Sequence, residues 1–267
     1  MKSARANGIR ICYEEAGSGA PLLLLHGFVL DHTLWDAQVD ALARSYRLIL
    51  PDLRGLGRTE NPDAQTSMEQ MADDMAGLLE ALGIGAAAVA GFSMGGFVLA
   101  QLALRHPLKV RAAAFLCTRA SADSPEQQKR RLELMHLVRN EGIEAFAQAF
   151  APHLFSPAYA SACPGGVAKI RRVVESQRPE GIAALLDAMR RREDAAPRLR
   201  EIQAPCAVLA GELDGLIQVQ DMRDLHAGLK DATFEVAEGS GHMAPMEAPG
   251  RVSFTLDQLM QRAGMWM

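Results

Sequence analysis

The stretch Ala86–Gly96, with the sequence AAAVAGFSMGG, limits the possible folds of this chain more than any other. A short apolar run ends in Gly91-Phe92-Ser93-Met94-Gly95, and a helical pattern begins directly after it. This is a G-x-S-x-G pattern between a strand and a helix. A sharp turn at Ser93 brings backbone close on both sides, so the positions two before and two after it must lack a Cβ atom. The stretch therefore predicts a strand, a tight turn that exposes the Ser93 hydroxyl, and a helix.

Short apolar runs alternate with helical patterns on both sides of this turn. Strands are expected at Ile9–Glu15 (an edge strand), Pro21–Leu25, Tyr46–Leu50, Ala86–Ala90, Val110–Cys117, Cys206–Ala210 and Thr233–Ala237. Helices are expected at Thr33–Arg44, behind a Thr66-x-x-Glu69 capping box, and at Gly96–Arg105, Val219–Leu229 and Arg251–Arg262. Buried strands that alternate with helices predict an α/β fold, with a mostly parallel, twisted sheet flanked by helices.

One long helical stretch interrupts this alternation. Ser121–Pro197 contains helical pieces but no convincing strand, and Pro157, Pro164 and Pro179 break it. We expect it to form a helical cap over the carboxyl edge of the sheet, where open α/β sheets bind ligands. The expected domains are therefore a core of residues 1–120 and 198–267 and a cap of residues 121–197.

Composition excludes several classes of function. The 267 residues suit one domain with an insertion, and the net charge of −4 gives no reason to expect nucleic acid or an anionic membrane as a partner. No apolar run approaches the ~18 residues of a membrane span, and the N-terminus lacks the apolar core of a signal peptide. The four scattered cysteines favour reduced thiols in a cytoplasmic protein over a metal site or disulfides. No motif calls for a metal, nucleotide or other cofactor.

An acid and a base follow two of the other expected strands. Asp214 follows Cys206–Ala210, and a carboxylate there can orient a histidine through its Nδ1 atom. Glu212 and Asp123 also lie at strand ends and are alternatives for this acid. His242 lies in a glycine-rich loop after the last strand. The order serine, aspartate, histidine is the order nucleophile, acid, base.

The loop after Pro21–Leu25 supplies a second candidate contribution. The Phe28 backbone N–H can stabilise an oxyanion together with the Met94 N–H, which lies at the start of a helix. His26, in the same loop, is expected to hold the loop by hydrogen bonding and to take no direct part in the chemistry.

Together these pieces resemble the α/β-hydrolase family over essentially the whole chain. The matching segments are LLLLHGF (22–28), PDLRGLGRT (51–59), GFSMGG (91–96), GELDGL (211–216) and GSGHMAPMEAP (239–249). The resemblance implies a Ser93–Asp214–His242 triad, with an oxyanion hole formed by the Phe28 and Met94 amides. The segment AMRRRED (188–194) resembles the branch of 3-oxoadipate enol-lactonases and small carboxylesterases. Related dehalogenases and epoxide hydrolases use aspartate as the nucleophile, so serine favours acyl transfer.

The expected activity is hydrolysis of a small, mainly apolar carboxylic ester or lactone through an acyl-enzyme. The expected pocket residues are Phe28, Met94, Leu134, Met135, Phe146, Phe150, Leu154, Phe155 and Met243. The run Arg190–Arg192 either binds a substrate carboxylate or forms a solvated helix face. Alternative functions for the same triad are a cofactor-free peroxidase or perhydrolase, a C–C hydrolase or lyase, and a receptor-like binding protein.

Overall fold

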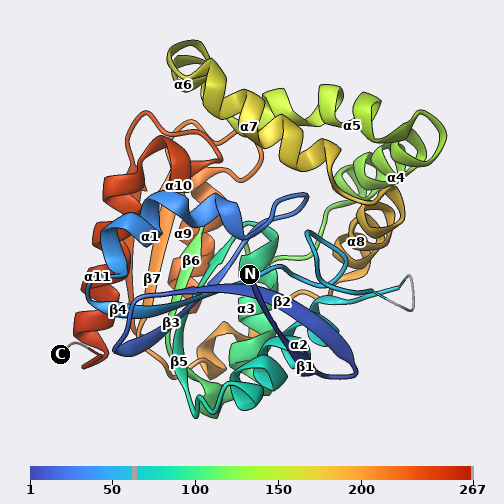
Figure 1. Cartoon of the computed structure of the whole chain (residues 1–267). Coiled ribbons are helices and arrows are strands. Elements are labelled where there is room, and N and C mark those ends of the chain that lie inside the picture. Colours follow the sequence, from blue (N-terminus) through green and yellow to red (C-terminus); the bar gives the residue numbers. More distant parts are fainter. Residues whose placement is uncertain (62–64, 266–267) are drawn as a thin grey trace.

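Eight strands form a single sheet at the centre of the computed structural model (Figure 1). The structure describes residues 1–61 and 65–265. The strands are β1 (Lys2–Ala6), β2 (Ile9–Ala16), β3 (Ala20–Leu25), β4 (Tyr46–Pro51), β5 (Ala87–Phe92), β6 (Val110–Leu116), β7 (Cys206–Gly211) and β8 (Ala232–Ala237). Their order across the sheet is β1-β2-β4-β3-β5-β6-β7-β8. Strand β2 is antiparallel to both of its neighbours, and all the other neighbouring strands are parallel, which confirms the predicted fold class.

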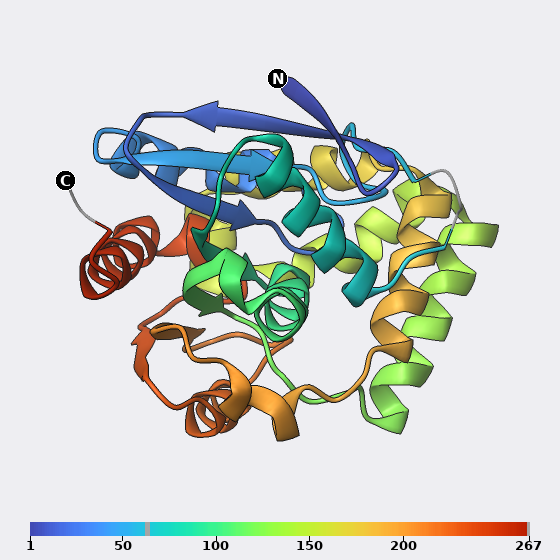
Figure 2. The same ribbon diagram turned by 90° about the horizontal axis from the view of Figure 1, so that it is seen from below.

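Helices cover both faces of the sheet. The core helices are α1 (Asp36–Leu42), α2 (Met68–Ala81), α3 (Met94–Arg105), α9 (Val219–Gly228), α10 (Ala244–Glu247) and α11 (Pro249–Arg262), with short 3₁₀ helices at His32–Trp35, Pro107–Lys109 and Ala196–Glu201. Helices α1 and α11 contact each other on one face, and α2 and α3 contact each other on the other (Figure 2). Since both faces are covered, every side chain from Leu22 to Leu25 is at most 1% exposed. This double burial explains why continuous apolar runs mark the central strands.

Two local predictions were wrong. The edge strand is β1, which pairs with β2, so the Ile9–Glu15 segment is an inner strand. Strand β1 is short and largely exposed, so it has no apolar pattern to mark it. Helix α2 is capped by Ser67, whose hydroxyl accepts the Gln70 N–H at 3.1 Å, and not by Thr66. Both residues have the hydroxyl that a cap needs, so sequence alone did not separate them.

Five helices between β6 and β7 form a layer above the carboxyl ends of the strands (Figure 1). They are α4 (Pro125–Asn140), α5 (Gly142–Phe150), α6 (Pro157–Ala162), α7 (Pro164–Glu175) and α8 (Pro179–Arg191), with a 3₁₀ helix at Ala151–Leu154. The prolines that sequence marked as breaks are the first residues of α6, α7 and α8, where the missing N–H has no helical partner to lose. Among all the described residues, no helix is long and apolar enough to cross a membrane.

Candidate active site

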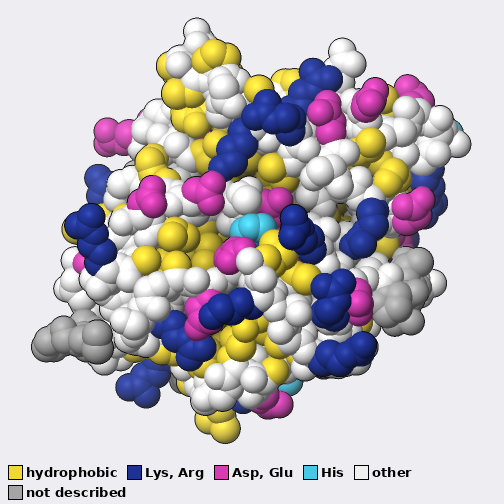
Figure 3. All heavy atoms as spheres, in the orientation of Figure 1, with side chains coloured by type: hydrophobic (Ala, Val, Ile, Leu, Met, Phe, Trp, Pro, Cys, Tyr) yellow, Lys and Arg dark blue, Asp and Glu magenta, His cyan; other side chains and the backbone are white. Residues whose placement is uncertain are grey.

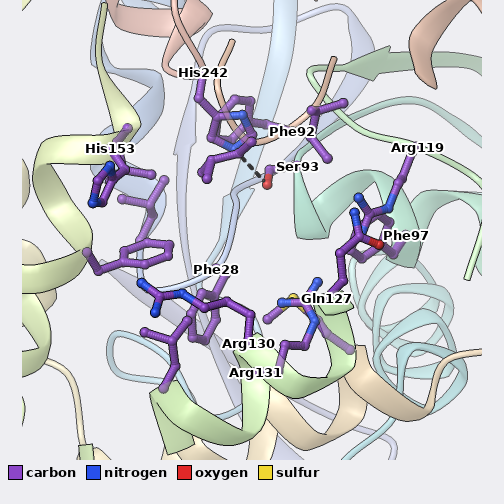
Figure 4. A pocket seen from close by; sticks show the side chains of 17 residues that line it. Phe28, Phe92, Ser93, Phe97, Arg119, Gln127, Arg130, Arg131, His153 and His242 are labelled. Carbon is purple, nitrogen blue, oxygen red and sulfur yellow. Dashed lines mark hydrogen bonds between the residues drawn. The ribbon is translucent and has the colours of Figure 1, made fainter. Parts of the chain in front are cut away.

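Ser93 occupies a strained turn between β5 and α3. Its backbone angles are φ 52° and ψ −118°, a region that residues with a Cβ atom rarely adopt. A Cβ atom on Gly91 would clash with the Gly95 carbonyl, and one on Gly95 would clash with the Leu25 carbonyl. The glycines of the motif are therefore required by backbone contacts, as the sequence pattern predicts. The turn brings the Ser93 side chain to the wall of a cavity above the sheet (Figure 4).

The structure brings Ser93, His242 and Asp214 together in one hydrogen-bonded chain. His242 Nε2 lies 2.9 Å from Ser93 Oγ, and His242 Nδ1 lies 2.7 Å from Asp214 Oδ2 (Figure 4 shows the first contact). The other carboxylate oxygen of Asp214 accepts the N–H groups of Leu216 and Ile217 at 2.8 and 2.9 Å. These bonds fix the carboxylate, so it can hold the imidazole with Nδ1 protonated and Nε2 free to accept the serine proton.

The two alternative acids lie elsewhere. Glu212 accepts the Gly239 N–H at 2.7 Å. Asp123 is buried among Arg119, Arg131 and Arg192, and it accepts hydrogen bonds from all three. Burial disfavours its charged form, but the guanidinium groups of Arg131 and Arg192 outweigh that effect and lower its pKa to about 2. Neither carboxylate hydrogen-bonds His242, so geometry favours Asp214 as the acid.

Two backbone N–H groups beside Ser93 are available to a ligand. Met94 is the first residue of α3, and Phe28 lies in the loop after β3. Neither N–H donates to an acceptor within residues 1–61 and 65–265. His26 holds this loop, because its Nε2 accepts the Leu53 N–H at 2.9 Å and its Nδ1 lies 2.8 Å from the Gly27 carbonyl oxygen. Burial lowers the pKa of His26, and both of its ring nitrogens contact backbone groups, as expected for a residue that holds the loop.

A cavity of about 350 Å³ lies between the sheet and the cap, with Ser93 and His242 in its wall. Its apolar lining is formed by Phe28, Leu30, Phe92, Phe97, Leu134, Phe150, Leu154, Met189, Leu216 and Ile217. Its polar lining, apart from Ser93 and His242, is formed by Arg119, Gln127, Arg130, Arg131 and His153. Of the expected pocket residues, Phe28, Leu134, Phe150 and Leu154 therefore lie where sequence predicted them.

The other expected pocket residues do not line this cavity. Phe146 packs behind the wall, with its ring centroid 6.2 Å from that of Phe28 and 5.3 Å from that of Phe150. Phe155 stacks on Tyr159, and Met94, Met135 and Met243 are buried in the core. Apolar side chains in a cap bury themselves against the domain as readily as they line a pocket, so hydrophobicity alone did not separate the two roles.

The run Arg190–Arg192 does not line the cavity, although a role in binding a substrate carboxylate would require that. Arg190 and Arg191 pair with Asp187 on α8, which is the solvated-face alternative. Arg192 is buried and pairs with Asp123, and its guanidinium carbon Cζ lies 4.1 Å from the centre of the Phe97 ring. None of the three arginines is part of the cavity lining.

Sequence reasoning missed the polar residues that α4 contributes. Gln127, Arg130, Arg131 and Leu134 all line the cavity, and their spacing of three and four residues places them on one helix face. That spacing was readable in the sequence. An α4 face carrying two arginines resembles a solvated surface, however, and only the tertiary structure shows that it borders the cavity.

An eight-stranded, mostly parallel sheet, a serine turn and an acid–histidine pair at separate strand ends are together typical of α/β hydrolases. Residues 20–249 match the model of the α/β hydrolase fold family, and the chain belongs to that family.

Relatives in this family include enzymes that act on esters and lactones. A thermophilic esterase from Thermogutta terrifontis, solved with malate bound, is 33% identical with a TM-score of 0.94, covering 98% of this chain and 99% of that one. The enol-lactonase from Burkholderia xenovorans LB400 is 28% identical with a TM-score of 0.91, and the match covers 97% of this chain and 100% of that one. The 3-oxoadipate enol-lactonase 2 of Acinetobacter baylyi is 28% identical over 86% of this chain and 84% of its own length. The family match and these relatives together identify the chain as a carboxylic ester hydrolase.

Proposed function

We propose that this enzyme hydrolyses a small carboxylic ester or lactone, mainly apolar next to the reacting carbonyl, through an acyl-enzyme on Ser93. The observation that carries the proposal is the Ser93–His242–Asp214 chain of hydrogen bonds in the wall of a cavity with many apolar side chains. The esterase and enol-lactonase relatives support the same class of substrate.

The proposed reaction has two halves. His242 Nε2 takes the proton of Ser93 Oγ as Oγ attacks the substrate carbonyl, and the Phe28 and Met94 N–H groups stabilise the resulting oxyanion. Collapse of this intermediate leaves an acyl group on Ser93, while His242 returns the proton to the departing alcohol oxygen. His242 then takes a proton from a water molecule that attacks the acyl group, and it returns this proton to Ser93 Oγ as the acid is released. Asp214 keeps the imidazole oriented in both halves, and the only other reactant is water.

The cellular setting belongs to the same proposal. We infer a cytoplasmic enzyme with a small-molecule substrate and no nucleic-acid or membrane partner. All four cysteines are free thiols in the structure, and three of them are buried, as suits a reducing compartment.

The test is active-site labelling combined with a panel of esters. A fluorophosphonate should label Ser93 stoichiometrically, and Ser93→Ala should lose both the label and hydrolysis of short p-nitrophenyl esters. The expected loss in kcat is on the order of 10⁴-fold or more. Labelling of a different serine would refute the nucleophile. If wild type and Ser93→Ala are equally inert on esters, thioesters and lactones, yet a small ligand binds tightly, the receptor-like alternative is correct.

A further inference from the structure

The cavity wall carries an excess of positive charge. Arg119, Arg130 and Arg131 line it, and no aspartate or glutamate is among its lining residues in the described part of the chain. The chain as a whole has a net charge of −4. On the outer face shown in Figure 3, acidic and basic side chains are interspersed. The accumulation of one sign of charge is therefore a local property of this cavity.

The cations in this wall and directly behind it outnumber the carboxylate that balances them. Arg119, Arg131 and Arg192 share the single carboxylate of Asp123. Arg119 is only 5% exposed, and its Nε–H has no hydrogen-bond partner within the described residues. Burial and the two neighbouring arginines lower the pKa of Arg192 to about 10, although Asp123 opposes them. Burying unbalanced cations is costly, so an anion in the cavity would be stabilised.

Arg130 lies on the same side of the cavity as Arg131, and its guanidinium group is available to a ligand. Figure 4 shows Arg130, Arg131 and Gln127 along α4, with Ser93 and His242 on the other side of the cavity. Within the described residues, the only acidic partner of Arg130 is Glu133, at 3.4 Å, and these side chains are 59% and 50% exposed. Such a long, exposed pair contributes little, so an incoming carboxylate can replace it. A guanidinium group matches a carboxylate with two parallel hydrogen bonds.

We propose that this cationic wall binds a carboxylate carried by the substrate, with Arg130 in direct contact, so that the ester or lactone cleaved is an anion. Arg119 and Arg131 keep the inner wall positive, and the apolar side chains hold the chain between the carboxylate and the reacting carbonyl. This inference rests on the proposed function, and it specifies the substrate class that the same site selects.

Matched esters test the inference. For a carboxylate on the acyl side, the pair is mono-4-nitrophenyl adipate and 4-nitrophenyl hexanoate. For a carboxylate on the alcohol side, the pair is 4-(hexanoyloxy)benzoate and its methyl ester. The measured quantity is the ratio of kcat/KM for the charged ester to that for the neutral ester, with the rate of Ser93→Ala subtracted.

In wild type, the charged member of one pair should be preferred, and added salt should weaken this preference by screening. Arg130→Gln should lower the preference roughly tenfold or more, as expected for loss of a charge-assisted hydrogen bond. The control is Arg139→Gln, because Arg139 is exposed on the same helix and does not line the cavity. It should keep the wild-type ratio. If the neutral esters are preferred in both pairs, or if Arg130→Gln leaves both ratios unchanged, the inference is wrong while the proposed function stands.

A binding measurement distinguishes failure of the proposed function from failure of this inference. If none of the esters is cleaved, the proposed function fails, and calorimetry on Ser93→Ala still tests the cationic wall. Monomethyl adipate, an anion, should then bind more tightly than neutral dimethyl adipate, and Arg130→Gln introduced into Ser93→Ala should remove the difference. Equal binding of the two compounds to Ser93→Ala would overturn the inference.

Discussion

Ser93 stores strain that the surrounding backbone must hold. Its positive φ costs of order 1–3 kcal/mol for a residue with a side chain. Two hydrogen bonds resist relaxation of the turn: the Ser93 N–H donates to the Leu116 carbonyl at 2.9 Å, and the Thr118 hydroxyl donates to the Ser93 carbonyl at 2.7 Å. The position of the nucleophile therefore depends on β6 and the residues after it as well as on the glycines beside it.

Changing the acid should separate orientation from folding. Asp214→Asn should lower kcat on the order of 10⁴-fold, the loss seen when the equivalent change in serine proteases favours the wrong histidine tautomer. Glu212→Gln is the matched control and should keep most of the activity, because in the described part of the chain the Glu212 carboxylate accepts only the Gly239 N–H. Kinetics on one p-nitrophenyl ester, with circular dichroism to check folding, measures both. If Glu212→Gln lost most of the kcat while Asp214→Asn kept it, the acid would be Glu212.

At the scale of elements, the cap holds the loop that carries His242. The Glu247 carboxylate accepts the Gly241 N–H from the loop and the Ser156 N–H from the start of α6, each at 3.0 Å. The Met243 N–H donates to the Leu154 carbonyl at 3.1 Å. The cap and the histidine loop are thus joined on both sides of His242.

Removing the Glu247 carboxylate should loosen this junction. Glu247→Ala should cost about 2 kcal/mol of stability, since it leaves two N–H groups without their acceptor, and it should lower kcat more than it raises KM. Glu247→Gln retains an acceptor oxygen and should recover much of both losses. Thermal unfolding and steady-state kinetics provide the measurements. A Glu247→Ala variant with wild-type kcat and a lowered melting temperature would show that the junction stabilises the fold without positioning His242.

The cluster around Asp123 should make stability fall in acid. The pKa of Asp123 is about 2 in the folded chain against an ordinary 3.8, so the unfolded chain takes up the proton first as the pH falls. The stabilisation, about 2 kcal/mol by linkage, is complete above pH ~4 and is lost as the pH drops through ~2. Urea unfolding of wild type and Asp123→Asn across this range should show the two converging towards low pH. A constant difference between them would contradict the role of this ion-pair cluster.

At the scale of the whole molecule, the site lies between two parts of the chain with different architecture. The turns and loops that follow β5, β7 and β8 supply Ser93, Asp214 and His242, whereas most of the far wall of the cavity comes from α4, α8 and the segment Phe150–Leu154. The cavity of about 350 Å³ is near the lower end of the range for small-molecule sites.

The size of this cavity should limit the acyl group. Activity on neutral p-nitrophenyl esters should be highest for chains of about two to six carbons and should fall steeply by laurate, because longer chains do not fit under the cap. A panel of kcat/KM values from acetate to laurate measures this, with Ser93→Ala as background. A steady rise towards laurate would mean that the cap opens to admit long chains.

The sequence by itself determined the order of the core strands and helices from Ile9 onwards and the conformation at Ser93. Continuous apolar runs, helical spacing and the two motif glycines are local properties, and backbone geometry converts them directly into structure. The family resemblance favoured Asp214 as the acid, but only the tertiary structure showed that its carboxylate contacts His242 while those of Asp123 and Glu212 do not, because all three residues follow strands. It alone showed that β1 forms the edge of the sheet.

The tertiary structure also decided which face of each cap helix borders the cavity. Met135 and Leu134 are neighbours with similar side chains, yet only Leu134 lines the cavity, with Arg130 and Arg131 on the same face of α4. The bond between Ser93 and His242 joins residues 149 positions apart. Contacts over such separations depend on how whole elements pack, since the sequence pattern of each element is compatible with several partners.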